Sequence, residues 1–118
     1  MNKLIVLVLV FLLLCVVTKE SLVGEELDIR ISQGQAVAFD RSAGNCLSCH
    51  AISGGELPGE IGPPLVEMKL RYPDRAVLRS QVWDAADRNP DTIMPPYGRH
   101  NILTEEELDL VVDFIHSL

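Results

Sequence analysis

The pattern of hydrophobic residues divides the chain into one continuous apolar run at its start and several periodic segments after it. Residues 4–17 form an uninterrupted apolar stretch of 14 residues that follows Lys3. This is the length of the hydrophobic part of a secretory signal, and it is short for a bilayer span. We therefore predict an export signal at residues 1–20, with an uncleaved membrane anchor as the alternative. The large Leu14 before Cys15 argues against lipid attachment at that cysteine.

Three later segments have the spacing of amphipathic helices. Residues 31–40 are the first, and Gly34 inside them marks a place where another helix could approach closely. Residues 73–87 are the second. The third begins at Thr104, which forms a capping-box pattern with Glu107 and precedes apolar residues at every third or fourth position.

The remaining segments predict loops and a linker. Residues 51–64 contain four glycines and three prolines, and residues 89–99 are also interrupted by prolines and a glycine. Residues 21–33 are expected to link the export signal to a domain at residues 34–118. No segment alternates with the period of a strand. We therefore predict an all-α domain of three or four helices joined by long loops.

Length and charge narrow the possible functions. A chain of 118 residues is enough for one small domain. Its formal net charge of −7 argues against binding to nucleic acid, which needs a basic surface.

Residues 46–50 read Cys-Leu-Ser-Cys-His, which is the attachment motif of c-type haem. The thiols of Cys46 and Cys49 can add to the two vinyl groups of one porphyrin, and His50 can bind its iron. We therefore predict one covalent haem c and, because this haem is attached outside the cytoplasm, a periplasmic protein. The alternatives are a zinc site completed by His100 and His116, whose spacing matches no common zinc pattern, and a redox dithiol, which lacks its βαβ setting.

The iron of an electron carrier needs a second axial ligand. Met94 lies 44 residues after His50 and is followed by two prolines, which hold it in a rigid loop suited to presenting a thioether. Met68 and His100 are the rival ligands, and His116 is expected to face solvent.

The segment Gly62-Pro63-Pro64-Leu65 follows the haem motif. A metal-bound histidine usually donates its other N–H to an oxygen that fixes its orientation. The carbonyl of Pro63 is the expected acceptor for His50, and an ordinary turn is the alternative interpretation.

Together these features resemble class I cytochrome c. The resemblance rests on Gly34, the motif at 46–50, the segment 62–65, Met94-Pro95-Pro96 and the terminal helix. It implies helices wrapped around one covalent haem. One departure is Phe39, which stands seven residues before Cys46, a wider spacing than usual that a short insertion after the first helix would explain.

Further segments resemble the SoxX family, which comprises the monohaem subunits of the SoxAX cytochromes of bacterial sulfur oxidation. They are residues 44–50, 58–65, 72–74, 78–84 and 94–104, the last containing the specific run Met-Pro-Pro-Tyr-Gly-Arg-His. The resemblance implies thioether bonds at Cys46 and Cys49, with His50 and Met94 as axial ligands of the haem iron.

The same resemblance implies a heterodimer with a SoxA-like subunit, which holds the catalytic site. The complex would couple thiosulfate oxidatively to a cysteine of a SoxYZ-type carrier and pass the electrons to a downstream c-type cytochrome. This chain would be the electron-transfer subunit, and the alternative is a freestanding periplasmic electron shuttle. Tyr97 and Ile102 are candidate partner contacts, with packing around the haem as their alternative role.

Overall fold

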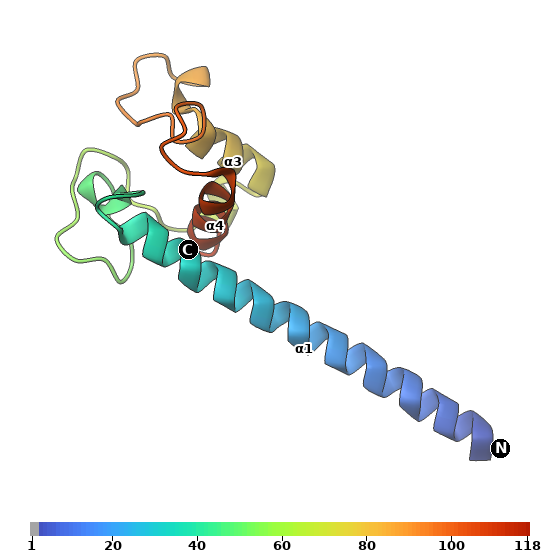
Figure 1. Ribbon diagram of the computed structural model, residues 1–118. Helices are drawn as coiled ribbons and strands as arrows, with labels where there is room; N and C mark the ends of the chain where they lie inside the picture. Colours follow the sequence, from blue (N-terminus) through green and yellow to red (C-terminus); the bar gives the residue numbers. More distant parts are fainter. Residues whose placement is uncertain (1–2) are drawn as a thin grey trace.

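The structure, a computed structural model, describes residues 3–118 (Figure 1). Met1 and Asn2, at the start of the predicted export signal, lie outside the described residues, as does the side chain of Cys15. The regular elements are α1 (Lys3–Phe39), η1 (Cys46–Ser48), α2 (Met68–Arg71), α3 (Arg75–Trp83), η2 (Ala85–Asp87) and α4 (Glu105–His116). Every regular element in this part of the chain is helical, and an isolated bridge joins Ile52 to Leu65. The all-α class is therefore confirmed.

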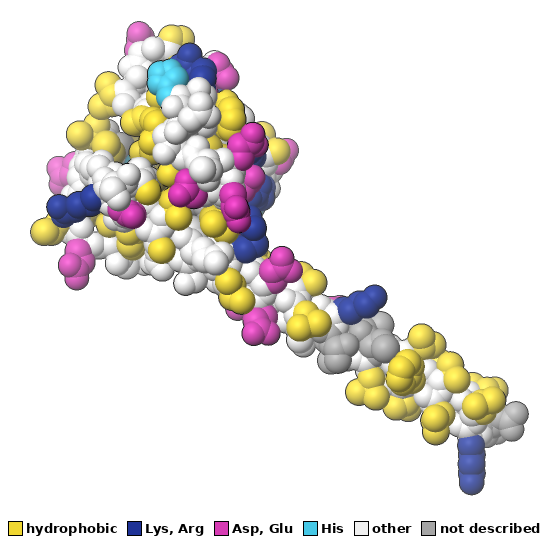
Figure 2. All heavy atoms as spheres, viewed as in Figure 1, with side chains coloured by type: hydrophobic (Ala, Val, Ile, Leu, Met, Phe, Trp, Pro, Cys, Tyr) yellow, Lys and Arg dark blue, Asp and Glu magenta, His cyan; other side chains and the backbone are white. Residues whose placement is uncertain are grey.

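The first helix is much longer than the predicted segment 31–40. It runs unbroken from Lys3, so the expected linker at residues 21–33 is helical. The physical reason is that no proline occurs before Pro58 and half of residues 21–30 are good helix formers. The N-terminal part of α1 forms an arm with exposed hydrophobic side chains (Figure 2). Among the described residues, no helix combines the length and the apolar character needed to cross a membrane.

The C-terminal part of α1 packs against α4, which forms the centre of the domain (Figure 1). Gly34 allows this contact, because a Cβ atom at that position would overlap the carbonyl group of Leu110. Phe39 and Phe114 meet edge to face beside it, with ring centroids 5.7 Å apart. The close helix contact predicted at Gly34 is confirmed, and Phe39 takes part in it despite its unusual distance from Cys46.

The start of α4 is fixed by a side-chain cap, and α3 ends earlier than predicted. The backbone N–H of Thr104 donates to the Glu107 carboxylate at 2.8 Å, and that of Glu107 donates to the Thr104 hydroxyl at 3.2 Å, which confirms the capping box. The helix predicted at 73–87 is shorter, because α3 ends at Trp83. The extended backbone of Asp84 interrupts it before η2.

An ion-pair network joins α1, α3 and α4. Asp113 on α4 accepts from Arg30 of α1 at 2.7 Å and from Arg75 of α3 at 2.5 Å. Its neighbour Asp109, one turn earlier, accepts from Arg79 at 2.9 Å. Because Arg30 lies within the predicted linker, the packed part of the structure begins before residue 34.

Candidate functional site

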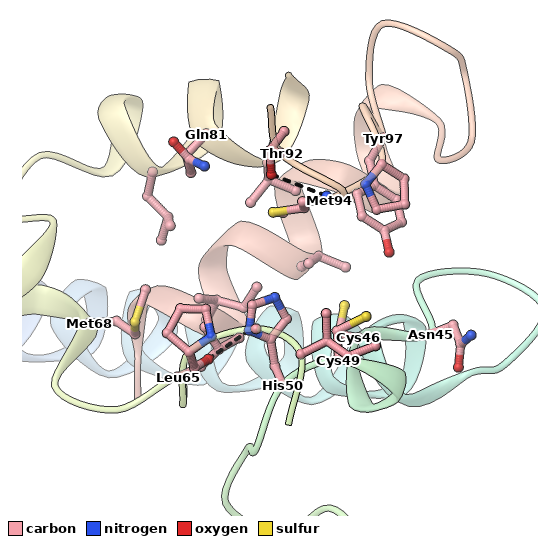
Figure 3. A pocket seen from close by; sticks show the side chains of 18 of the residues that line it. Asn45, Cys46, Cys49, His50, Leu65, Met68, Gln81, Thr92, Met94 and Tyr97 are labelled. Atoms are coloured by element: carbon pink, nitrogen blue, oxygen red, sulfur yellow. Dashed lines mark hydrogen bonds between the residues drawn. The ribbon is translucent and has the colours of Figure 1, made fainter. Parts of the chain in front are cut away.

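A cavity lies between two walls of the domain and is lined mainly by apolar side chains. Cys46, Cys49 and His50 stand on one wall, and Met94 and Tyr97 stand on the opposite wall (Figure 3). Buried residues of α3 and α4 close its back: Leu78, Val82, Val111 and Ile115. The structure thus brings together all four residues that the sequence predicts to hold a haem.

The tight turn of η1 places the two thiols side by side. Asn45 enters the turn with left-handed backbone at φ 50°. The amides of Cys49 and His50 both donate to the carbonyl oxygen of Cys46, at 3.2 and 2.9 Å. Both thiols are free and line the cavity.

Burial raises the pKa of the Cys46 thiol to about 11. A reactive redox dithiol needs the opposite shift, because the thiolate is its nucleophile. The zinc alternative also lacks support, since no group of three histidine, cysteine or acidic residues that could hold a metal ion occurs among residues 3–118 whose placement is described. Neither His100 nor His116 lines the cavity.

The imidazole of His50 is oriented by the loop that follows it. Its Nδ1 lies 2.7 Å from the carbonyl oxygen of Pro63, the acceptor that we predicted. Because a carbonyl can only accept, Nδ1 carries the proton and Nε2 keeps its lone pair for a metal. Gly62 is part of the same support: its amide donates to Cys49 at 2.7 Å, and a Cβ atom there would overlap the imidazole.

Met94 faces His50 from the other wall (Figure 3). It is half-buried, and its backbone amide donates to the hydroxyl of Thr92 at 3.2 Å. Of its rivals, Met68 also lines the cavity but is buried, with its sulfur 3.4 Å from the guanidinium of Arg71. His100 is exposed and outside the cavity lining.

The expectation that His116 faces solvent is wrong. Its imidazole is half-buried, and Nε2 donates to the carbonyl oxygen of Tyr72 at 3.0 Å. The last turn of α4 packs near α2, so the position of His116, which we expected to face solvent, is covered by a neighbouring element.

Tyr97 connects the two walls, a role that the sequence did not predict. Its hydroxyl donates to the carbonyl oxygen of Gly44 at 2.7 Å, just before the haem motif. Burial raises the pKa of this phenol to about 12, so it stays a hydrogen-bond donor at neutral pH. Ile102, the other candidate partner contact, is exposed and does not line the cavity.

Asp84 is a second residue that the sequence analysis missed. Its side chain is 5% exposed and forms a 2.5 Å ion pair with Arg99, at the end of the loop that carries Met94. An aspartate after an amphipathic helix normally indicates an exposed end, so the hydrophobic pattern gave no sign of its burial.

The chemistry of the cavity suits a large, flat, mostly apolar group bound covalently. Two thiols lie at its edge, one imidazole nitrogen is free to coordinate, and a thioether faces it from the opposite wall. A thioether and an imidazole are the ligand pair of low-spin haem in electron carriers.

Comparison with known proteins agrees with this chemistry. Residues 31–118 match the family model described as Cytochrome c. A search of curated proteins finds no match for this chain.

Proposed function

We propose, from the premise that this chain belongs to the cytochrome c family, that it is the electron-transfer subunit of a periplasmic SoxAX-type complex. Membership of the family establishes a covalent haem c and a role as an electron carrier. The thiosulfate chemistry, the partners and the periplasmic location are our proposal. Cytochromes c typically work outside the cytoplasm, which is consistent with the apolar N-terminal stretch.

The electron-transfer part of the proposal is carried by the pairing of His50 with Met94 across one cavity (Figure 3), whereas the SoxAX part rests on the resemblance of sequence segments. In our assignment Cys46 and Cys49 would form the thioether bonds, and His50 and Met94 would bind the haem iron. When bound, the haem supplies a one-electron couple whose potential is raised by thioether ligation. The protein contributes the orientation of His50 through Pro63 and a mainly apolar lining around the site.

The cavity offers no residues for the thiosulfate reaction itself. Its only thiols among the described residues are those of Cys46 and Cys49, which the haem attachment uses, and no carboxylate lines it. A SoxA-like subunit would therefore perform the coupling of thiosulfate to a SoxYZ-type carrier. This chain would pass the electrons to a downstream c-type cytochrome.

Two of the segments that resemble the SoxX family meet in the structure. Trp83 lies in one of the resembling segments and Gly98 in another, and the amide of Gly98 donates to the Trp83 carbonyl at 3.1 Å. A Cβ atom at Gly98 would overlap the indole of Trp83. The run around Met94 therefore requires a glycine at position 98 beside this tryptophan.

The haem assignment is tested by expression of the exported protein. We expect colour that stays with the polypeptide in acid–acetone and a mass increased by one haem. The oxidised protein should show the weak near-infrared band of His/Met ligation, which Met94→Ala should abolish with a fall in reduction potential. Loss of the band in His100→Ala or Met68→Ala, with Met94→Ala unaffected, would show that another residue is the ligand.

The partner assignment is tested by co-expression with a SoxA-like chain that carries the only affinity tag. We expect co-purification at micromolar concentration, no thiosulfate-dependent turnover by this chain alone, and haem reduction when both chains and the carrier are present. Full activity of the SoxA-like chain alone, without co-purification, would instead identify a freestanding electron shuttle.

A further inference from the structure

The loop that carries Met94 is closed at both ends by three consecutive residues, Trp83 to Ala85. At its beginning, the amide of Asn89 donates to the carbonyl oxygen of Ala85 at 3.1 Å. At its end, the amides of Gly98 and Arg99 both donate to the carbonyl oxygen of Trp83, at 3.1 and 3.3 Å. The position of Met94 therefore depends on the junction at Asp84 and Arg99. Neither of these two residues lines the cavity.

Asp84 is the buried charge at this junction. Its side chain is 5% exposed, and Asp84 is the only buried polar or charged residue among the described residues. One carboxylate oxygen accepts from the amide of Ala86 at 3.1 Å, and the other forms an ion pair with Nε of Arg99 at 2.5 Å. A buried carboxylate that loses its cationic partner is costly, so this pair strongly favours the closed loop.

The link from Arg99 to Met94 is stiff. Pro95 and Pro96 fix two backbone φ angles directly after Met94, and Gly98 is pressed against the indole of Trp83. A shift of Arg99 away from Asp84 is therefore transmitted along the loop to Met94, with little freedom in between to absorb it.

We propose that Asp84 and Arg99 are positioning residues that hold Met94 in place as the distal ligand of the haem iron. This inference rests on the proposed function, in which Met94 is that ligand. Neither residue contacts the cavity, so both act through the loop. Breaking the pair should increase the fraction of molecules in which the distal position is open to an external ligand.

The experiment compares Asp84→Asn and Arg99→Gln with Asp113→Asn in the full-length holoprotein. Asp113 is a matched control, because it is also a poorly exposed aspartate paired with arginines but lies at the α1–α4 contact. Imidazole, added to the oxidised protein, serves as the competing ligand. Near-infrared absorption, imidazole affinity and thermal unfolding are measured for each variant.

We expect Asp84→Asn and Arg99→Gln to lose more than half of the near-infrared band and to bind imidazole about tenfold more tightly, since apparent affinity follows the open fraction. Arg99→Lys should retain most of the band, because an ammonium can still pair with Asp84. Asp113→Asn should lower the unfolding temperature and leave the band and the imidazole affinity unchanged.

Two results separate failure of this inference from failure of the proposed function. If Asp84→Asn and Arg99→Gln are destabilised but keep the wild-type band and imidazole affinity, the positioning role is wrong and the pair is only structural. If Met94→Ala keeps the band of the wild type, the ligand assignment itself is wrong. Because the Arg99 side chain is 54% exposed, Arg99→Gln leaves no internal cavity. Arg99→Lys, which keeps a cation beside Asp84, controls for the cost of leaving that buried carboxylate unpaired.

Discussion

The hydroxyl of Tyr97 donates to the carbonyl oxygen of Gly44 across 2.7 Å, and this bond joins the loop of Met94 to the segment that enters the haem motif. We expect Tyr97→Phe to lower the free energy of unfolding by about 1 kcal/mol, because Gly44 is buried and its carbonyl loses a donor. Chemical denaturation of the holoprotein measures the change. Tyr72→Phe is the control, since its ring can keep the contact with Arg88.

The same tyrosine predicts a dependence of stability on alkaline pH. Burial raises the pKa of Tyr97 to about 12, above the usual value of about 10. A raised pKa means that the stabilisation is complete below pH about 10 and is lost as the pH rises towards 12. Denaturation curves between pH 9 and about 11 should show this loss in the wild type and a smaller one in Tyr97→Phe. Equal slopes for both proteins would contradict the prediction.

Gly62 is expected to be intolerant of a side chain, because a Cβ atom there would overlap the imidazole of His50. We expect Gly62→Ala to lower the free energy of unfolding by about 1–3 kcal/mol and to weaken the near-infrared band by tilting the imidazole. Visible and near-infrared spectra of the oxidised protein provide the measurement. An unchanged spectrum would show that the loop of Gly62 and Pro63 can move without disturbing the ligand.

Gly34 and Gly24 provide a matched pair on the same helix. A Cβ atom at Gly34 would overlap the carbonyl of Leu110, whereas one at Gly24 would meet nothing within 4 Å. Gly34→Ala should therefore destabilise the domain by about 1–3 kcal/mol through separation of α1 and α4. Gly24→Ala should cause no loss, because alanine favours the helix. Thermal unfolding distinguishes the two, and equal effects would rule out the close helix contact.

Two truncations test where the domain begins. A protein starting at residue 21 should unfold like the full-length chain, since the residues removed are exposed wherever their side chains are described. A protein starting at residue 34 should lose about 1–3 kcal/mol, because Asp113 loses Arg30, which bonds to it at 2.7 Å. Arg30→Gln in the longer protein should reproduce part of this loss. Identical unfolding of both truncations would support the boundary that the sequence predicted.

The sequence predicted the parts of the site that depend on local chemistry. The spacing of Cys46 and Cys49, the proximity of Pro63 to His50 and the cap at Thr104 are each set by residues close together in the chain. The structure confirms the hydrogen bond and the cap, and it places Met94 opposite His50. The role of Met94 as a ligand remains a prediction.

What the sequence could not reveal depends on contacts between distant segments. Asp84 and Arg99 pair only because the loop of Met94 returns to the end of α3, and Tyr97 reaches Gly44 across the cavity. The start of the first helix was misjudged for another reason. A polar stretch such as residues 21–30 suits both a linker and an exposed helix, and the contact of Arg30 with Asp113 decides between them.

The continuous helix α1 implies two regimes of stability within one element. The part after Arg30 is held by α4 and should exchange its amide hydrogens only when the whole domain unfolds. The part before Arg30 has mostly exposed side chains where these are described, so it follows a helix–coil equilibrium set by its own sequence. Helix α1 therefore joins a segment that is ordered by packing against α4 to a segment whose helicity depends on the apolar surface that it contacts.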